Sequence, residues 1–265
     1  MAHSLIPAWC PAGRALSSGG VDCPAPVAVE GSRVAHSAQV RGTGKTMAVD
    51  WAVFEGLQPE VVREVLAVAG RRRFKRGDIV FHEGDPGDTL HLLAKGRVTV
   101  RVTTPLGDSA TLSVLGPGAI FGELALLSGA DRRAATVTCL EAVETMALHR
   151  DAFTELRKRQ PQVDQVLVQI LATQLPVLSA RLLEALFVPA DKRVLRQLVS
   201  VARLYGPLGH AVTIPLTQED LAGLAGTTRP TVNKVLRTAE EAGALSLGRG
   251  RIELRDLALI ERRAR

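Results

Sequence analysis

The feature that most constrains the fold is a series of short segments with alternating apolar residues between positions 74 and 148, separated by glycine-containing turns. The strand-forming segments lie at residues 79–81, 90–93, 98–102, 111–115 and 135–138. Because successive side chains of a strand point to opposite faces, this alternation is typical of strands with one buried face. Glycine and aspartate between the segments favour tight turns. The pattern predicts a β-sandwich or barrel of about 75 residues.

The chain has 265 residues, which suffices for two domains of ordinary size. Apolar residues make up 46% and charged residues 23%, and this excludes a mostly disordered or a collagen-like chain. No run approaches the roughly 20 apolar residues of a membrane-spanning helix. The N-terminus lacks the basic segment and apolar core of a signal peptide, so we expect a soluble, cytoplasmic protein.

Residues 1–46 are rich in Gly, Ala, Ser and Pro and show no apolar periodicity, so they are predicted to form a disordered tail. Met47 stands directly before the first organised segment and is an alternative translation start. The GTGKT stretch at 42–46 is similar to the end of a phosphate-binding loop. However, Gln39 stands where that pattern needs a glycine, and we expect no nucleotide-hydrolysing loop.

Neither a metal centre nor an enzyme active site is indicated. Cys10, Cys23 and Cys139 are too few and too widely spaced for a disulfide framework or a metal site. No motif pairs a nucleophile with a base and an orienting group. We therefore expect a protein without catalytic residues and without a bound metal.

The positive charge is concentrated at the C-terminal end. Residues 188–265 have 13 Lys and Arg against eight Asp and Glu, whereas residues 47–187 have 16 against 17. A basic module behind a neutral body is typical of a domain that meets phosphate backbones. Double-stranded DNA is the expected partner of this module.

A helical period begins after Arg150, and apolar residues recur at intervals of three and four from Val163 to Leu186. This spacing predicts a helix of about 25 residues with a long apolar stripe. Either the barrel or a second copy of the helix must cover the stripe, and we favour a homodimer. The expected seam contains Leu167, Leu171, Leu175, Leu178 and Leu182. Pro176 removes a helix hydrogen bond, so we predict a kink or break near residues 172–176.

Two short helices joined by a glycine turn are predicted near the C-terminus. Thr217 is expected to cap a helix that begins at Gln218, with Asp220 completing a capping box. Gly226 permits a tight turn, and Thr228 is expected to cap the second helix. This arrangement is a helix-turn-helix.

Three further elements complete the expected secondary structure. Apolar spacing predicts one helix over residues 54–66 and another over 190–204. Residues 245–254 are predicted to form a hairpin, which would be the wing of a winged helix-turn-helix.

In such a motif the start of the second helix enters the major groove, where all four base pairs can be distinguished. The candidate groove residues are Arg229, Thr231, Asn233 and Lys234. The candidate phosphate contacts are Thr217, Thr228, Lys234, Arg249 and Arg251, together with Gln218 as a further DNA-binding residue. The alternative is a winged domain that contacts another protein.

A candidate ligand site lies in residues 121–136, where the sequence FGELALL is followed by RRAAT. The start of a short helix offers backbone N–H groups to a phosphate, and Arg133 can pair with the same anion. Glu123 can accept a hydrogen bond from a ribose hydroxyl. These groups favour a cyclic nucleotide as ligand. The simpler alternative is a buried ion pair between Glu123 and Arg133.

Together these motifs resemble the Crp–Fnr family over residues 54–255. FGELAL with RAAT matches the family's phosphate-binding cassette, the turns at 84–88 and 95–96 match its β-roll turns, and residues 217–234 match its helix-turn-helix. The resemblance implies an α+β fold with an N-terminal cyclic-nucleotide-binding β-roll, which is jelly-roll-like, a long dimerisation helix and a C-terminal winged helix-turn-helix. The implied boundaries are 47–160, 161–187 and 188–265.

The resemblance also implies a homodimeric transcriptional regulator that binds DNA and contacts RNA polymerase. Its implied effector is a cyclic nucleotide, with cyclic AMP favoured. The implied nucleotide-binding residues are Gly122, Glu123, Leu124, Arg133, Ala134, Leu178 and Ser179.

Three positions depart from well-known members of the family. Leu178 stands where cyclic-AMP-responsive members have a threonine, which weakens adenine recognition, and Ala134 replaces a serine near the phosphate. Pro230 replaces a glutamate that reads a base, so a different half-site is expected.

Three other functions are compatible with these features. One is a cyclic-nucleotide-binding regulatory subunit that acts on a protein partner, and another is a Crp–Fnr regulator with a different effector or with none. The third is a redox or haem sensor with candidate ligands His82, His91 and His149.

Overall fold

A computed structural model of the chain describes residues 51, 54, 58–104, 107–127, 131–206 and 211–265. These residues all belong to one unit of packed elements, which spans 47–265. The predicted tail at 1–46, the alternative start at Met47 and the GTGKT stretch lie outside the described residues.

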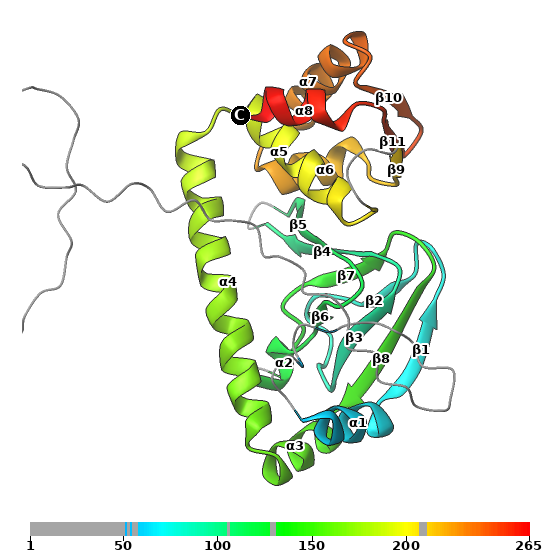
Figure 1. Cartoon of the computed structure of the whole chain (residues 1–265), viewed down its shortest axis with the longest axis vertical. Coiled ribbons are helices and arrows are strands. Elements are labelled where there is room, and N and C mark those ends of the chain that lie inside the picture. Colours follow the sequence, from blue (N-terminus) through cyan, green and yellow to red (C-terminus); the bar gives the residue numbers. More distant parts are fainter. Residues whose placement is uncertain (1–50, 52–53, 55–57, 105–106, 128–130, 207–210) are drawn as a thin grey trace, which may run out of the picture. The chain divides into compact units, whose positions relative to one another are not determined.

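Two four-stranded antiparallel sheets form the first part of the fold (Figure 1). One sheet has the order β1-β8-β3-β6 and the other the order β2-β7-β4-β5. The strands are β1 (Gly70–Phe74), β2 (Ile79–Phe81), β3 (Thr89–Lys95), β4 (Val98–Thr103), β5 (Ser109–Leu115), β6 (Ile120–Phe121), β7 (Thr136–Cys139) and β8 (Val143–His149). The predicted β-sandwich of short strands is therefore confirmed.

The sheets enclose an apolar core. Leu93, Phe121 and Val143 of the first sheet pack with Val98 and Val137 of the second. The opposite face of the first sheet packs against helices in a separate cluster that includes residues of β3, α1 and α3. The strand β3 is therefore buried on both faces, which explains why all its residues from Leu90 to Ala94 are buried.

Strand β1 begins earlier than the predicted strand region, which starts at Phe74. Its sequence GRRRF carries no apolar alternation, and the strand lies at the edge of its sheet. Glu144 on the neighbouring β8 pairs with Arg71 and lies 3.1 Å from Arg73 Nε. Ion pairs to β8 therefore help to hold this edge strand in the sheet. Because the strand has no apolar periodicity, the sequence pattern does not reveal it.

The helices of this part are α1 (Pro59–Val68), α2 (Leu124–Leu127), α3 (Arg150–Arg159) and α4 (Gln162–Phe187). The predicted start of the first helix at Phe54 was wrong, because α1 begins at Pro59. Proline fits the first helical position, since its fixed φ is helical and no partner exists there for an N–H group.

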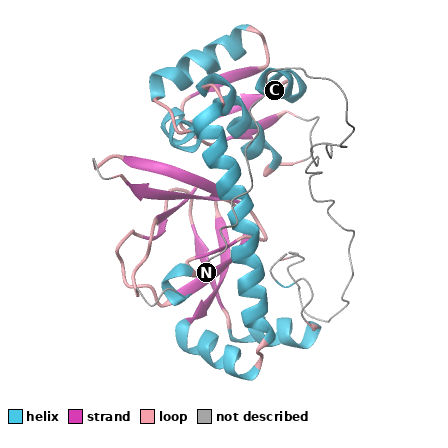
Figure 2. Cartoon of the chain, turned by 90° about the vertical axis from the view of Figure 1, so that its left-hand side faces the viewer, coloured by secondary structure: helices cyan, strands magenta, loops and turns pink. Residues whose placement is uncertain are grey.

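The helix α4 runs through Pro176, so the predicted break was wrong, and Figure 2 shows the helix as one continuous segment. Pro176 costs the hydrogen bond to the Ala172 carbonyl, but Ala172 is exposed and water can satisfy that group. The C-terminal part of the apolar stripe of α4 is uncovered in the single chain, where Leu175 is 68% exposed and Leu182 is 61% exposed. Its N-terminal part is covered, because Val163 is buried and Leu167 packs partly buried against the core cluster beside the first sheet. No helix in the described part of the chain is long and apolar enough to cross a membrane.

The C-terminal module contains α5 (Ala190–Arg203), β9 (Val212–Ile214), α6 (Gln218–Ala225), α7 (Arg229–Glu241), β10 (Leu245–Gly248), β11 (Arg251–Leu254) and α8 (Leu257–Ala264). The predicted helices, turn and wing hairpin are confirmed, and β9 adds a third strand beside β11. Leu198, Leu221 and Leu236, from three different helices, are fully buried in its core.

The capping predictions had different outcomes. Thr217 and Asp220 form the predicted capping box at the start of α6, and Gly226 ends the helix with φ 57°. Thr228 precedes α7 as predicted, but its side chain makes no capping bond. Its hydroxyl instead lies 3.0 Å from the hydroxyl of Thr231, so the two hydroxyls satisfy each other.

Candidate functional site

The candidate ligand site is built from three segments that are distant in sequence. They are the turn at 84–88, the β6–α2 junction at 121–125 and the segment 131–136. The amide of Gly84 donates to the Arg133 carbonyl at 2.9 Å, and the amide of Arg133 donates to the Asp85 carbonyl at 2.8 Å. The turn and the arginine-bearing segment are therefore held together by backbone hydrogen bonds.

Gly122 and Gly87 permit the close approach of these segments. Gly122 has φ 82°, and a Cβ there would lie 2.7 Å from Arg133 Nη1. A Cβ on Gly87 would lie 2.2 Å from the Cβ of Ala125. Only glycine fits both positions, because one needs a left-handed backbone and the other needs the space of a missing side chain.

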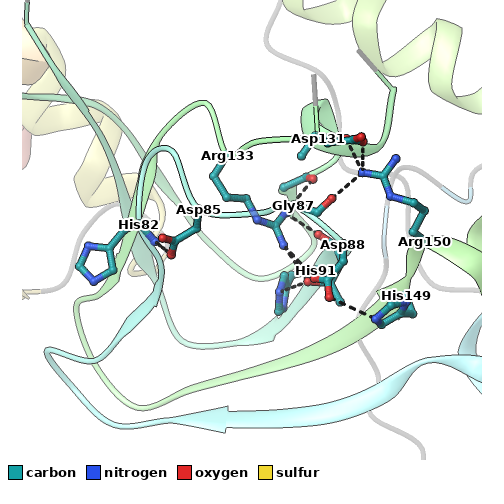
Figure 3. Close-up of polar contacts among 12 residues, drawn as sticks. His82, Asp85, Gly87, Asp88, His91, Asp131, Arg133, His149 and Arg150 are labelled. Atoms are coloured by element: carbon teal, nitrogen blue, oxygen red, sulfur yellow. Dashed lines mark hydrogen bonds and ion pairs between the residues drawn. The ribbon is translucent and has the colours of Figure 1, made fainter. Parts of the chain in front are cut away.

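Arg133 points into this site and its side chain is only 3% exposed (Figure 3). Its Nη1 donates to the carbonyls of Thr89 at 2.5 Å and Gly122 at 3.1 Å, and Nη2 donates to Thr89 Oγ1 at 2.7 Å. The guanidinium also lies 4.1 Å from the centre of the Phe81 ring. Neutral groups and an aromatic face thus fix the position of a buried cation.

The charge of Arg133 is incompletely compensated. The nearest paired carboxylate is Asp88, whose Oδ1 lies 3.8 Å from Nη2 on a side chain that is 61% exposed. The buried Nε has no hydrogen-bond partner among the described residues. Burial lowers the pKa of Arg133, and the charge of Asp88 opposes this shift. A buried cation with unused hydrogen-bonding capacity can accept an anionic ligand at low cost.

Glu123 does not form the ion pair that the simpler alternative predicted. In the described residues the Arg133 side chain contacts Thr89, Gly122 and Asp88 instead. Burial raises the pKa of the half-buried Glu123 carboxyl, although a backbone hydrogen bond and the charge of Arg133 act in the opposite direction. The buried ion pair was therefore the wrong explanation for the spacing of the two residues.

The other predicted nucleotide-binding residues are solvent-accessible. Leu124 is 46% exposed at the start of α2, and Ala134 is exposed after the arginine. Leu178 and Ser179 are exposed on α4. The structure of the single chain does not test whether these four residues contact a nucleotide.

Several residues around the site were missed by sequence reasoning. Thr89 and Phe81 hold the Arg133 side chain, and Arg150 contacts three parts of the site. Sequence reasoning recognised the turn at 84–88 and the motif at 121–136, but these three residues have no distinctive spacing that would identify them.

The histidines of the sensor hypothesis lie in different surroundings. His91 is buried, its ring stacks 5.1 Å from that of Phe121, and its Nδ1 lies 3.1 Å from Thr145 Oγ1. Burial lowers the pKa of His91 to about 4, and the charge of Arg133 acts in the same direction. His149 is exposed beside Asp88. Within the described ranges no group of three or more His, Cys, Asp or Glu is placed to hold a metal ion.

The helix-turn-helix places its polar residues at the surface. Arg229, Asn233 and Lys234 are exposed on α7, and Arg249 and Arg251 are exposed in the wing. Gln218 Nε2 lies 3.4 Å from Asn233 Oδ1, which links the starts of α6 and α7. A cavity of about 440 Å³ lies between these helix starts and the wing, lined partly by Thr217, Arg229 and Arg251.

The sequence matches two protein families. A cyclic nucleotide-binding domain is matched by residues 71–160, and a Crp-like helix-turn-helix domain by residues 192–263. The cyclic AMP receptor protein of Thermus thermophilus is 38% identical over 210 residues, which cover 79% of this chain and 94% of that protein. The chain belongs to the Crp–Fnr family of transcriptional regulators.

Other Crp–Fnr members are similar over most of their length. The CRP-like cAMP-activated global transcriptional regulator of Mycobacterium tuberculosis is 32% identical over 216 residues, which cover 80% of this chain and 96% of that protein. The crystal structure of a CRP/FNR family transcriptional regulator from Thermus thermophilus superimposes with a TM-score of 0.60 and 26% identity, covering 74% of this chain and 98% of that one. The fold class predicted from the sequence is therefore confirmed, and it is the fold of the Crp–Fnr family.

Proposed function

We propose that the chain is a homodimeric, sequence-specific DNA-binding transcriptional regulator whose effector is cyclic AMP, bound in the β-roll. In this proposal residues 47–160 bind the nucleotide, 161–187 form the dimer seam and 188–265 bind DNA. Arg133 binds the cyclic phosphate with the backbone of Ala134, Gly122 and Glu123 hold the ribose hydroxyl, and Leu124 lines the site.

The observation that carries the proposal is the environment of Arg133. Its side chain is buried, the only paired carboxylate among the described residues lies 3.8 Å away, and its Nε has no partner there. An anion with several acceptor oxygens would compensate the charge and use the remaining donor. A cyclic phosphate fits this chemistry, and the half-buried Glu123 supplies an acceptor for an adjacent hydroxyl.

Cyclic AMP is favoured over other cyclic nucleotides by two relatives that are more than 30% identical and are named for it. Recognition of the base is assigned to Leu178 and Ser179 of α4. Because Leu178 offers no hydrogen bond, Ser179 is the polar contact that can distinguish adenine from guanine.

The dimer seam is supported by the uncovered part of the α4 stripe, where Leu171, Leu175, Leu178 and Leu182 face solvent in the single chain. A second α4 would remove this surface from water, which is favourable by about 25 cal/mol per Å². The seam would contain Leu167, Leu171, Leu175, Leu178 and Leu182.

DNA binding is supported by the exposed polar residues at the start of α7 and in the wing. Arg229, Thr231, Asn233 and Lys234 would lie in the major groove, with Thr217, Gln218, Thr228, Arg249 and Arg251 against the phosphates. RNA polymerase is the proposed protein partner of the DNA-bound dimer.

The first experiment is a calorimetric titration with cyclic AMP and cyclic GMP. Micromolar binding of cyclic AMP, about −8 kcal/mol, is expected, with weaker binding of cyclic GMP. Arg133→Leu should abolish binding, whereas Arg159→Leu, which changes an exposed arginine of α3, should not. Absence of heat with either nucleotide would contradict the effector assignment.

A second experiment separates the proposal from a regulatory subunit that acts on a protein partner. The purified chain with cyclic AMP should retard mixed-sequence DNA in a gel at low salt, where contacts to the phosphate backbone are strongest. Failure to retard any DNA under these conditions would favour the regulatory subunit.

A further inference from the structure

The side chain of Arg150, the first residue of α3, reaches into the junction of the three segments that form the nucleotide site (Figure 3). Its Nη2 donates to the Gly87 carbonyl at 2.6 Å and to the Ala125 carbonyl at 2.9 Å. The same nitrogen lies 2.8 Å from Oδ1 of Asp131. One guanidinium nitrogen therefore contacts the turn, α2 and the arginine-bearing segment.

Each of the three contacted residues is linked to a residue that is proposed to bind the nucleotide. Two are close to such a residue in sequence, and the third lies in a turn that is hydrogen-bonded to the backbone of one. Ala125 follows Glu123 by two residues, and Asp131 precedes Arg133 by two. Gly87 belongs to the turn that is hydrogen-bonded to the Arg133 backbone. A shift of any of the three segments would therefore move a residue assigned to the ribose or to the phosphate.

Asp131 is held in an uncommon backbone conformation at this junction. Asp131 is the only non-glycine residue with positive φ among the described residues, at 49°. Its carbonyl accepts from the Gly87 amide at 2.8 Å, while its carboxylate contacts Arg150. Aspartate tolerates the left-handed conformation better than most residues, and these contacts hold Asp131 in it.

We propose that Arg150 is a positioning residue for cyclic nucleotide binding: it does not contact the nucleotide, but fastens the segments that carry Glu123 and Arg133 in the geometry that binds it. This inference rests on the proposed function of the site. None of the nucleotide-binding residues named above lies in α3, so the inference gives this helix a new role in ligand binding.

The chain offers a matched control on the same helix. Arg157 also pairs with an aspartate, its Nε lying 2.5 Å from Asp164 Oδ1, and its side chain is 39% exposed against 32% for Arg150. Arg157→Met thus removes a comparable ion pair that touches none of the three segments.

The first readout is the affinity for cyclic AMP measured by calorimetry. Arg150→Met should weaken binding about tenfold, which corresponds to about 1.4 kcal/mol and is the size of one hydrogen bond to a charged group. Arg150→Lys should bind with intermediate affinity, because an ammonium can donate to the same acceptors from a side chain that is one bond shorter. Arg157→Met should bind as the unaltered protein does.

The second readout is hydrogen exchange without nucleotide. The amides of Gly84, Gly87 and Arg133 join the segments, and Arg150→Met should accelerate their exchange. The amides of Cys139 and Leu140, which bond elsewhere in the β-roll, should keep their rates and so report an intact fold.

The two readouts distinguish this inference from the proposed function. Unchanged exchange at the three joining amides, or equal loss of affinity in Arg150→Met and Arg157→Met, would overturn the positioning role. If the unaltered protein binds no cyclic nucleotide while Arg150→Met accelerates exchange at those amides, the proposed function fails and Arg150 is shown to hold the segments for another purpose.

Discussion

The Arg101 guanidinium of β4 lies 2.6 Å from Oδ1 of Asp220 in α6, and the Thr111 hydroxyl of β5 donates to the same oxygen at 3.0 Å. The other carboxylate oxygen accepts from the Thr217 backbone amide at 3.1 Å, which closes the capping box, and from the Thr217 hydroxyl at 2.7 Å. One buried carboxylate therefore both caps the first helix of the helix-turn-helix and binds the β-roll.

Asp220→Ala should destabilise the protein by about 2 kcal/mol, because it removes a helix cap and leaves Arg101 without its partner. The expected result is a lower midpoint in urea-induced unfolding followed by circular dichroism. Glu219→Ala, which changes the exposed neighbour, should leave the midpoint nearly unchanged. Equal midpoints for Asp220→Ala and the unaltered protein would contradict this role.

The contribution of Asp220 to stability should depend on pH. Burial opposes ionisation of this carboxyl, but the hydrogen bond from Thr217 and the charge of Arg101 outweigh it, so its pKa lies below the ordinary value. A carboxyl with a depressed pKa stabilises the fold above its unfolded pKa, about 3.9, and this contribution is lost as pH falls through the folded pKa. Urea midpoints of the unaltered protein and Asp220→Ala should differ at neutral pH and converge in acid. A constant difference would count against the assignment.

The helix-turn-helix was predictable because its signals are local. Thr217, Asp220 and Gly226 specify where α6 begins and ends, and the buried face of α7 follows a helical period. The site in the β-roll was predictable only in part. Glu123 and Arg133 stand in a recognisable motif, but the partners of Arg133 include Thr89, which is 44 residues away in sequence.

The remaining misses have physical reasons. The charged strand β1 has no apolar alternation, because its edge position leaves its arginines exposed. Proline is unfavourable inside helices in general, and only the surroundings of Pro176 show that α4 continues through it. Arg150 acts through contacts made by the folded chain, so no spacing in the sequence indicates it.

Gly122→Ala should impair nucleotide binding as well as stability. The new Cβ would lie 2.7 Å from Arg133 Nη1 and 3.1 Å from the Thr89 carbonyl oxygen. Gly77→Ala is the control, since Gly77 has φ 86° and a Cβ there meets nothing within 4 Å. The control should cost only the backbone strain of about 1–2 kcal/mol, while Gly122→Ala should also lose cyclic AMP affinity. Calorimetry and urea unfolding of both variants measure the two effects, and unaltered affinity in Gly122→Ala would contradict the site geometry.

Substitution of a residue assigned to a base and of a residue assigned to a phosphate should affect DNA binding differently. Arg229→Ala should cost about 1–3 kcal/mol on the preferred site and relax specificity there, because it removes a contact to a base. Arg251→Ala should weaken binding to all sequences and lower the salt slope by about one, because it removes a phosphate contact. Arg237→Ala, on α7 but paired with Glu240, is the control. Fluorescence anisotropy with several DNA sequences and salt concentrations distinguishes these outcomes, and identical effects of all three variants would refute the assignment.

Charged substitutions in the apolar stripe of α4 should convert the dimer to monomers. Leu171→Glu with Leu182→Glu would place four carboxylates in the seam of two facing helices, where burial of unpaired charge is costly. Sedimentation velocity should show the monomer mass, and DNA affinity should fall because two half-sites are no longer bound together. Val68→Glu alters an apolar residue that is 54% exposed on α1, away from the stripe, and should remain dimeric. A double variant that sediments as a dimer would show that the stripe is covered in some other way.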